Sequence, residues 1–475
     1  MTRPENSAAR LCVSAASGGG GKTLLSLGLA RFLQRKGFAV KPFKKGPDYI
    51  DAAWLSLAAG KPATNLDLWF LPQDRLRALF THAMRQARGE IGLIEGNRGL
   101  FDGLDATGSC STAELARTLG CPVLISLNCA KMTRTAAALV KGICNFEPDI
   151  AVCGLVLNQV GSPRHETALR RALEACTEVP VLGALPRLAE NPLPERHMGL
   201  ASFGEGLSER AEGILDDLAA FVGSHVDTDA VLAAARAAPE LPEEKSFWDG
   251  DSPYPRDGTK KAATPRIGYV QDAALWFYYQ ENLESLTRAG AELVRLSLFD
   301  SRPWPDVDGL YLGGGFPEDM AEQLSASPHL ELLRNRACAG MPVYAECGGF
   351  MLLTQGIERD DHVWEMSGLF PVRARFCAKP QGLGYVRAKV ARENPWFDIG
   401  LELRGHEFHY SRCEWSGPPP PAALRLERGT GMGMFADGAC DGFVFKNVFA
   451  AYTHIFAPSL PCWARNFTRL ALDWR

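Results

Sequence analysis

A cysteine followed by two glycines is the first candidate for chemistry in this sequence. In the run VYAECGG (343–349), an apolar strand leads into Cys347, and an apolar helical run follows the glycines. This order predicts a sharp strand-to-helix turn that exposes the sulfur, with glycines that admit a substrate. The N-terminus of the helix is expected to lower the pKa of the thiol. Cys347 is therefore the predicted nucleophile.

A second glycine loop and a late histidine are candidates to complete this site. The loop LGGGFPE (312–318) ends another apolar strand, and its N–H groups would stabilise charge on a reacting carbonyl. The candidates for this oxyanion hole are Gly314, Gly315 and Gly348. The candidate base is His454, which ends the run AAYTH (450–454) after a β-rich stretch. His406 and His409 lie in RGHEFHYS (404–411) and leave the choice of base open.

A glycine-rich loop between a strand and a helix carries the second chemical signal. The loop SGGGGKT (17–23) would crowd backbone N–H groups around a phosphate, which requires residues without side chains. The candidate nucleotide-binding residues are Gly18, Gly19, Gly20, Gly21, Lys22 and Thr23. Lys22 would reach the β- and γ-phosphates of ATP, and the Thr23 hydroxyl would ligate Mg²⁺. The strict pattern has glycine where this chain has Ala16, but the strand–loop–helix context still predicts a phosphate site.

Acidic residues follow two further predicted strands, at the edge where a parallel sheet places its ligands. The runs are KKGPDYID (44–51) and EGNRGLFDG (95–103). Asp48 and Glu95 are predicted to ligate Mg²⁺ together with Thr23, although acids at these positions also cap helices and turns. Asn158 ends another strand and is a candidate for contact with adenine, with a plain strand-end role as the alternative.

The elements that must position these residues alternate between strand and helix. Apolar strands are predicted at 11–13, 38–43, 91–94, 123–127 and 152–157, and again at 267–270, 292–296, 309–312 and 343–345. Continuous apolar strands separated by helices predict α/β domains with parallel sheets covered on both faces. The segment 237–265 is rich in proline, glycine and charge and is predicted to be a linker. We expect a P-loop domain over 1–236 and a second α/β domain over 266–475.

Composition excludes several classes of protein. The chain has 475 residues with Lys+Arg 51 and Asp+Glu 55, so its net charge of -4 gives no basic field for nucleic acid. No apolar run has the ~20 residues that a membrane helix needs. The 13 cysteines include no C-x-x-C pair, which disfavours zinc ribbons and disulfide frameworks. A cleaved leader would destroy the loop at 17–23, so a cytoplasmic protein is expected.

Taken together, the motifs resemble those of the cobyrinic acid a,c-diamide synthase family. The glycine loop with GKT, KKGPDYID, EGNRGLFDG, LPERHMGL (193–200), LGGGFPE, ECGGFMLL, RGHEFHYS and a late histidine occur in the family's order. The resemblance implies a dethiobiotin-synthetase-like ATP-dependent ligase followed by a class I glutamine amidotransferase domain. Carried over to this chain, it implies Cys347 as the nucleophile, His454 as its base and Lys22 as the P-loop lysine.

The implied reaction amidates the a and c acetates of a corrinoid with glutamine and ATP. Ammonia released from glutamine would displace phosphate from an ATP-activated carboxylate. The candidates for contact with the macrocycle are Lys44, Lys45, Tyr49, Asp102, Arg196 and His197, and the basic ones among them also fit a solvated face. A homo-oligomer stays possible, and the sequence does not give its size.

Two departures from the family pattern affect what is implied. Many class I amidotransferases carry a glutamate two residues after the histidine, and here that position is Phe456, so the partner of His454 is unknown. Asn97 and Arg98 stand where smaller apolar residues are more usual. Nickel-sirohydrochlorin and hydrogenobyrinic acid remain alternative substrates. A P-loop switch ATPase with a regulatory C-terminal domain is the alternative from another class, and glutaminase activity would separate the two.

Overall fold

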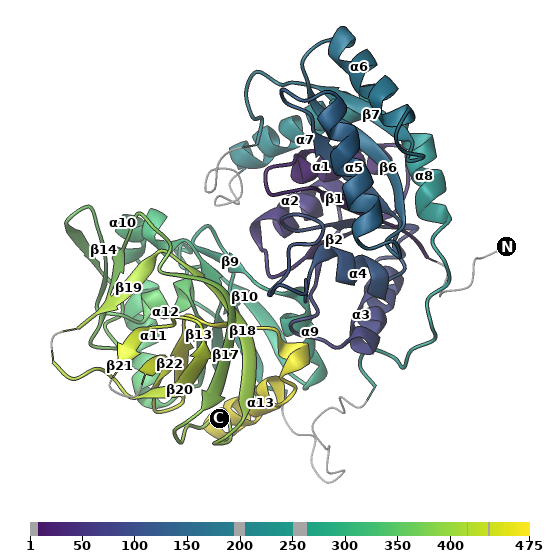
Figure 1. The fold of residues 1–475 in the computed structure, drawn as a ribbon. Coiled ribbons are helices and arrows are strands. Elements are labelled where there is room, and N and C mark those ends of the chain that lie inside the picture. The colour runs from purple at the N-terminus through teal and green to yellow at the C-terminus, as the bar shows by residue number, and fades with distance from the viewer. Residues whose placement is uncertain (1–7, 194–204, 250–263, 416, 436–437) are drawn as a thin grey trace. The chain divides into compact units, whose positions relative to one another are not determined.

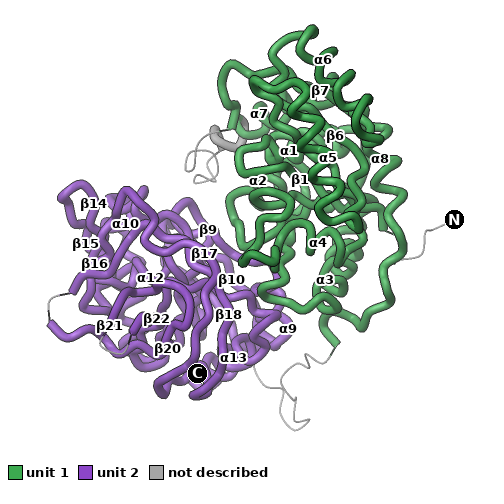
Figure 2. Tube along the Cα trace, in the orientation of Figure 1, with its two compact units in different colours: residues 1–200, 204–249 green, residues 201–203, 250–475 purple. Residues whose placement is uncertain are grey.

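The computed structural model describes residues 8–193, 205–249, 264–415, 417–435 and 438–475. The chain divides into two compact units, residues 1–200 with 204–249 and residues 201–203 with 250–475 (Figure 2). Within the described residues, no helix combines the length and the apolar character needed to cross a membrane.

Unit 1 is built on a seven-stranded sheet in the order β3-β2-β4-β1-β5-β6-β7. Figure 1 labels β1, β2, β6 and β7 of this sheet. Every strand pairing in this sheet is parallel. The strands are β1 (Ala9–Ala15), β2 (Val40–Lys45), β3 (Thr64–Leu66), β4 (Ile91–Glu95), β5 (Val123–Asn128), β6 (Val152–Val160) and β7 (Val181–Pro186). The expected parallel sheet is confirmed for this unit, and β3 and β7 extend it beyond the five strands predicted there.

Helices connect these strands and bury their apolar faces against the sheet. They are α1 (Lys22–Arg35), α2 (Ile50–Ala59), α3 (Gln73–Gln86), α4 (Thr112–Thr118), α5 (Arg134–Phe146), α6 (Pro163–Glu174), α7 (Glu205–His225) and α8 (Thr228–Arg236). One core joins the strands to α1, α2, α7 and α8, with Leu29, Trp54 and Leu215 among its buried side chains. Parallel strands buried on both faces need such helices, because each connection must bring the chain back to the end of the sheet where the strands begin.

Part of the segment predicted to be a linker is packed against unit 1. Phe247 and Trp248 are buried, and the indole N–H of Trp248 donates to His82 Nε2 at 3.2 Å. The Arg77 guanidinium pairs with Glu244 at 2.6 Å. Aromatic side chains within a polar segment thus hold residues 244–248 on the domain surface. The domain limits at 236 and 266 stay predictions.

Unit 2 contains an eleven-stranded mixed sheet in the order β10-β8-β11-β13-β23-β22-β20-β17-β18-β24, with β21 paired to β22. The first five strands of this order pair in parallel, and the remaining pairings are antiparallel. A wholly parallel sheet is therefore wrong for this unit. The reason is that β17, β18, β20 and β22 follow one another without intervening helices, and direct connections between neighbouring strands favour antiparallel pairing.

The strands of this sheet are β8 (Arg266–Val270), β10 (Glu292–Leu296), β11 (Gly309–Leu312), β13 (Val343–Glu346), β17 (Gly382–Val390), β18 (Glu402–His409), β20 (Ala422–Arg428), β21 (Gly433–Phe435), β22 (Gly438–Phe445), β23 (Val448–Ala451) and β24 (His454–Ile455). A two-stranded sheet pairs β12 (Gly314–Gly315) with β9 (Leu275–Phe277). A four-stranded sheet has β15 (His362–Glu365), β14 (Gly356–Arg359), β16 (Arg373–Phe376) and β19 (Ser411–Glu414).

The helices of unit 2 are α9 (Gln280–Arg288), α10 (Ala321–Ser325), α11 (Pro328–Ala339), α12 (Gly348–Leu352) and α13 (Cys462–Trp474), with 3-10 turns η2 (Pro317–Asp319) and η3 (Ala457–Ser459). One core includes Leu312, Ala345 and Phe350, from β11, β13 and α12. The two glycine loops predicted to form the thiol site thus leave adjacent strands of one buried sheet, since β11 pairs with β13.

Candidate functional site

The glycine loop of unit 1 lies between β1 and α1, where the sequence places it. Gly21 caps α1 with φ 86°, a left-handed conformation that glycine adopts without strain. A Cβ at Gly20 would lie 2.5 Å from the Cβ of Ala15, and a Cβ at Gly21 would overlap the side-chain amide of Asn158. Gly18 and Gly19 have open space around them. The first two glycines therefore leave the loop open, whereas the last two permit close packing.

Side chains from β5 and β6 contact the backbone of this loop. The Ser126 hydroxyl and the Asn158 amide donate to the Gly20 carbonyl, at 2.7 and 3.3 Å. The Asn158 side-chain oxygen also accepts from the backbone N–H of Gln159 at 2.9 Å. These contacts give Asn158 a role in supporting the loop, and its contact with adenine stays a prediction. Lys22, at the start of α1, donates to the Ser17 carbonyl at 3.2 Å and so folds back over the loop.

The predicted metal ligands of the first domain surround a buried lysine. The Thr23 hydroxyl donates to Glu95 Oε1 at 2.8 Å. Lys44 Nζ donates to the same oxygen at 2.8 Å and to Asp51 Oδ2 at 2.6 Å, and it lies 3.9 Å from Asp48 Oδ2. Lys44 is therefore directed into an acidic cluster of Asp48, Asp51 and Glu95. The cluster therefore holds more carboxyl groups than the one ammonium that contacts them.

Burial perturbs the ionisation of this acidic cluster. Burial, partly offset by Lys44, raises the pKa of Glu95 to about 7. Burial and the neighbouring Asp51 raise the pKa of Asp48 to about 6. Burial alone would lower the pKa of the Lys44 ammonium, but the three carboxylates outweigh it and raise that pKa. The charged forms of these side chains are therefore stabilised by contacts within the cluster rather than by water.

The donor set fits Mg²⁺. Glu95 is completely buried, and its Oε2 has no hydrogen-bond partner within the described structure. A hydroxyl and an orphaned carboxylate oxygen beside a phosphate loop are oxygen ligands of the kind that Mg²⁺ takes. No group of three or more His, Cys, Asp or Glu side chains within the described ranges is arranged to hold a metal. The protein would therefore supply only part of the coordination shell, as expected where phosphates and water complete it.

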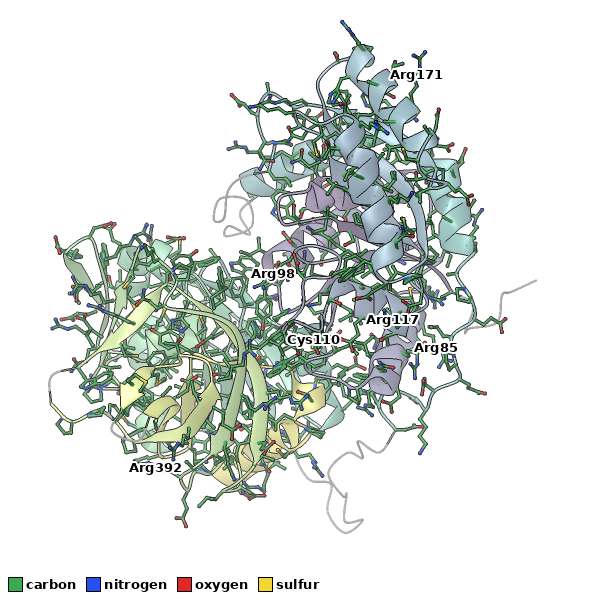
Figure 3. All side chains as sticks on the ribbon, viewed as in Figure 1. Arg85, Arg98, Cys110, Arg117, Arg171 and Arg392 are labelled. Atoms are coloured by element: carbon green, nitrogen blue, oxygen red, sulfur yellow. The ribbon has the colours of Figure 1, made fainter. Side chains whose placement is uncertain are left out.

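The remaining candidates for contact with the substrate have different surroundings. Lys45 is buried and lies 3.9 Å from Asp67, so it is not an exposed anchor. Tyr49 precedes α2 and is partly buried, and the exposed Asp102 accepts from the Gly99 N–H at 2.8 Å. Arg196 and His197 lie outside the described residues. The exposed Arg98 follows β4 with φ 51°, and Figure 3 labels it.

In unit 2, Cys347 occupies the sharp turn that the sequence predicts. It joins β13 to α12 with φ 47° and ψ -104°, a conformation that costs a non-glycine residue on the order of 1–3 kcal/mol. The Cys347 N–H donates to the Ala451 carbonyl at 2.7 Å, and the sulfur lies 3.6 Å from the Phe408 carbonyl oxygen. Strain held by the surrounding structure is a common feature of functional sites.

The expected lowering of the thiol pKa is wrong. Burial, reinforced by the carboxylate of Glu318, raises the pKa of the Cys347 thiol well above its ordinary value. The N–H of Gly348 favours the thiolate but does not outweigh these effects. The physical reason is that α12 spans only Gly348–Leu352 and the sulfur is almost fully withdrawn from water. The thiol is therefore protonated at rest and needs a base.

His454 lies beside a carboxylate that the sequence did not indicate. Its Nδ1 is 3.4 Å from Glu346 Oε2, and both side chains are fully buried. Glu346 also accepts from the Ile455 N–H at 3.0 Å and from the Tyr311 hydroxyl at 3.1 Å. These contacts fix the carboxylate from β13, one residue before Cys347. The arrangement places a thiol, an imidazole and a carboxylate on neighbouring elements.

The other two histidines of RGHEFHYS have distinct contacts. His406 stacks on His454 with ring centroids 4.8 Å apart, and burial lowers its pKa well below the ordinary value. His409 Nδ1 donates to the Ser411 carbonyl at 2.7 Å, and its Nε2 lies 3.5 Å from Glu407 Oε2. A neutral His406 packs against the candidate base, and His409 pairs with a separate carboxylate.

The glycines proposed for the oxyanion hole lie at one junction. Gly349 N–H donates to the Gly313 carbonyl at 2.9 Å and ties the two loops together. A Cβ at Gly348 would lie 3.0 Å from the Gly315 nitrogen, and a Cβ at Gly314 would lie 3.2 Å from His454 Nε2. Only glycine permits this approach of the two loops and the imidazole. Their action as an oxyanion hole stays a prediction.

Comparisons with known proteins match two parts of the chain to two different domain families. A family model of the CobQ/CobB/MinD/ParA nucleotide binding domain matches residues 11–200, and one of the CobB/CobQ-like glutamine amidotransferase domain matches residues 266–460. A cobyrinate a,c-diamide synthase of Magnetococcus marinus is 40% identical over 467 residues, which are 98% of this chain and 97% of that protein. This chain belongs to the cobyrinate a,c-diamide synthase family.

Other members of the cobyrinate a,c-diamide synthase family match as fully. Proteins of that name from Dehalococcoides mccartyi and Archaeoglobus fulgidus are 40% and 37% identical, with 98% of this chain covered in each case and 98% and 97% of those proteins. The resemblance predicted from the motifs is confirmed. The match over 266–460 favours an amidotransferase domain over the regulatory domain of a switch ATPase.

Proposed function

We propose that the chain amidates the a and c acetate side chains of cobyrinic acid, with glutamine as nitrogen donor and ATP as activator. The support for this proposal is that one chain, similar over nearly its whole length to cobyrinate a,c-diamide synthases, carries candidate residues for both reactions. The first group is the buried set of Cys347, His454 and Glu346, and the second is the glycine loop with its Thr23–Glu95 pair.

In the amidotransferase domain, His454 takes the proton of Cys347 as the sulfur attacks the carboxamide carbon of glutamine. The same proton passes to the departing nitrogen, so ammonia leaves and a thioester remains. Water then cleaves the thioester to glutamate and restores the thiol. Glu346 positions His454 and stabilises the imidazolium that forms during both steps. A thiol with a raised pKa makes this proton transfer necessary.

In the nucleotide-binding domain, transfer of the γ-phosphoryl group of ATP to a corrinoid carboxylate would give an acyl phosphate. Attack by ammonia on its carbonyl carbon forms the amide and expels phosphate. Lys22 would leave the Ser17 carbonyl to reach the phosphates, and Thr23 and Glu95 would hold Mg²⁺, with Asp48 nearby. Mg²⁺, when bound, neutralises phosphate charge. Because Lys44 and Lys45 are paired internally, we assign the exposed Arg98 to a macrocycle carboxylate.

The test is mass spectrometry of the products formed from cobyrinic acid, hydrogenobyrinic acid and nickel-sirohydrochlorin, offered in parallel with ATP and glutamine. Cobyrinic acid is expected to gain two amides at the highest rate. Preferential diamidation of either other macrocycle would assign this chain to that substrate. Absence of glutaminase activity would reject the amidotransferase part of the proposal.

Two variants separate the sites by their nitrogen donor. Cys347→Ala is expected to lose glutamine-supported amidation and keep the reaction with ammonium salt, because the thiol only generates ammonia. Lys22→Ala is expected to lose both reactions at least about a hundredfold, because activation of the carboxylate precedes attack by either donor. Cys338→Ala and Lys36→Ala, on the surface of the same units, serve as matched controls. Loss of ammonium-supported turnover in Cys347→Ala would contradict this division of roles between the two sites.

A further inference from the structure

Glu318 is a buried carboxylate beside the thiol that the mechanism above does not use. It lies in η2, directly after the glycine loop, and η2 packs on α12. A Cβ at Gly348 would lie 2.9 Å from Cδ of Pro317, so this turn closes over the start of α12. Glu318 is only 8% exposed, and its Oε2 has no hydrogen-bond partner within the described structure.

The other carboxylates that act on the Cys347 sulfur are Glu346 and Asp441, and both are occupied by protein donors. Glu346 accepts from Ile455 and Tyr311 and faces His454. Asp441 accepts from the backbone N–H groups of Gly442, Tyr452 and Thr453 and from the Thr453 hydroxyl. Glu318 is thus the carboxylate of this set with an oxygen left for a ligand.

A neighbouring cation does not satisfy that oxygen. Arg359 Nη1 donates to Asp319 Oδ1 at 2.6 Å and to the backbone carbonyl of Glu318 at 3.4 Å. Burial therefore dominates and raises the pKa of the Glu318 carboxyl to about 7. A buried carboxylate with an unfilled acceptor is costly unless a cationic donor arrives with the substrate.

We propose that Glu318 binds the α-ammonium group of glutamine in the amidotransferase domain. The inference rests on the proposed glutaminase activity and adds the residue that selects an amino acid over a simple amide. When the carboxamide carbon is at the sulfur, two methylene groups separate it from the carbon that bears the ammonium. That ammonium supplies the donor that Glu318 lacks. An ammonium–carboxylate pair withdrawn from water discriminates strongly against a ligand without the charge.

The experiment compares glutamine with 4-carbamoylbutanoate, which has the same carboxamide and carboxylate but no ammonium. Ammonia release is measured at pH 8 for wild type and Glu318→Gln. Wild type is expected to prefer glutamine in kcat/KM on the order of a hundredfold, and Glu318→Gln to prefer it by about threefold or less. The loss is expected chiefly in KM. Asp319→Asn, the adjacent carboxylate engaged by Arg359, is the matched control and is expected to keep the wild-type preference.

The outcomes distinguish this inference from the proposed function. Glu318→Gln with the wild-type preference overturns the inference and leaves glutaminase activity intact. Wild type that hydrolyses neither amide, or hydrolyses them independently of Cys347, overturns the proposed function itself. Ammonium-supported amidation reports that the variant is folded, and Glu318→Ala provides a second route to the same preference ratio. A wild-type enzyme with no preference between the amides also overturns the inference.

Discussion

Replacement of Glu346 by glutamine removes one charge from the thiol site and leaves the shape of the side chain almost unchanged. In the variant, the amide oxygen is expected to keep accepting from the Ile455 N–H, because that backbone donor cannot move. The amide nitrogen then takes the place of the oxygen that faces Tyr311 and His454. Its N–H donates to His454 Nδ1, so the imidazole proton moves to Nε2. A base with a proton on the nitrogen nearest the substrate cannot take another from Cys347.

The magnitude follows from the 3.4 Å separation between Glu346 Oε2 and His454 Nδ1. At an effective dielectric constant of ~20, opposite unit charges at that distance attract by about 5 kcal/mol. Part of this is offset because the amide keeps the packing and one hydrogen bond. A net loss of about 3 to 4 kcal/mol corresponds to a fall of roughly two to three powers of ten in kcat.

The assay is glutamine hydrolysis by the intact chain, with ammonium-supported amidation as the internal standard. Glu346→Gln is expected to lower kcat for glutamine while KM and the ammonium reaction stay close to wild type. Glu346→Asp, which keeps the charge, is expected to recover part of the rate, and the exposed Glu365→Gln is the matched control. A glutaminase rate within threefold of wild type would refute the positioning role. Equal losses with both nitrogen donors would trace the effect to folding.

Two further predictions concern carboxylates. Asp48→Asn is expected to slow phosphate release about a hundredfold in the presence of macrocycle and ammonium, with partial recovery in excess Mg²⁺. The control Asp74→Asn, at an exposed position, is expected to keep the wild-type rate. Unchanged release in Asp48→Asn would remove Asp48 from the metal site. Burial raises the pKa of Glu318 from 4.5 to about 7, so its protonated form stabilises the fold fully below the unfolded pKa and the benefit is lost as pH rises through about 7. In urea unfolding, the free energy of unfolding of Glu318→Gln relative to that of wild type is therefore expected to rise by about 2 to 3 kcal/mol between pH 5 and pH 8. A difference that does not change with pH would contradict the assigned burial.

The local signals were predictable because each depends on residues close together in the chain. The strand, glycine loop and helix around Lys22 and the turn at Cys347 follow from apolar runs interrupted by glycine. The partner of His454 was not predictable in this way. Glu346 reaches the imidazole because β13 and β23 pair in parallel with Glu346 opposite Ala451, which brings the following His454 alongside. The one hint in the sequence is that Glu346 directly precedes Cys347, but this position alone does not indicate which side chain Glu346 meets.

Residue type misled the sequence interpretation at Lys44. Lysine is seldom fully buried, so a lysine pair beside a strand end suggested an exposed anchor for carboxylates. The structure buries Lys44 because Asp51 and Glu95, from different elements, offer compensating charge. Asp51 stands in the same motif as Asp48, and the motif alone does not distinguish the two acids. Which of several acids in a motif meets a given lysine depends on the helix and strand that carry them.

The raised pKa of the Cys347 thiol also bears on the chain's resistance to oxidants. Peroxides convert thiolates, rather than thiols, to sulfenic acid, and they need access to the sulfur. All 13 cysteines are free, and Cys176 and Cys338 are exposed while Cys347 is buried. Surface cysteines therefore react first in the resting protein. Cys347 becomes vulnerable only while its proton is on the base, which ties oxidative inactivation to the time the enzyme spends in turnover.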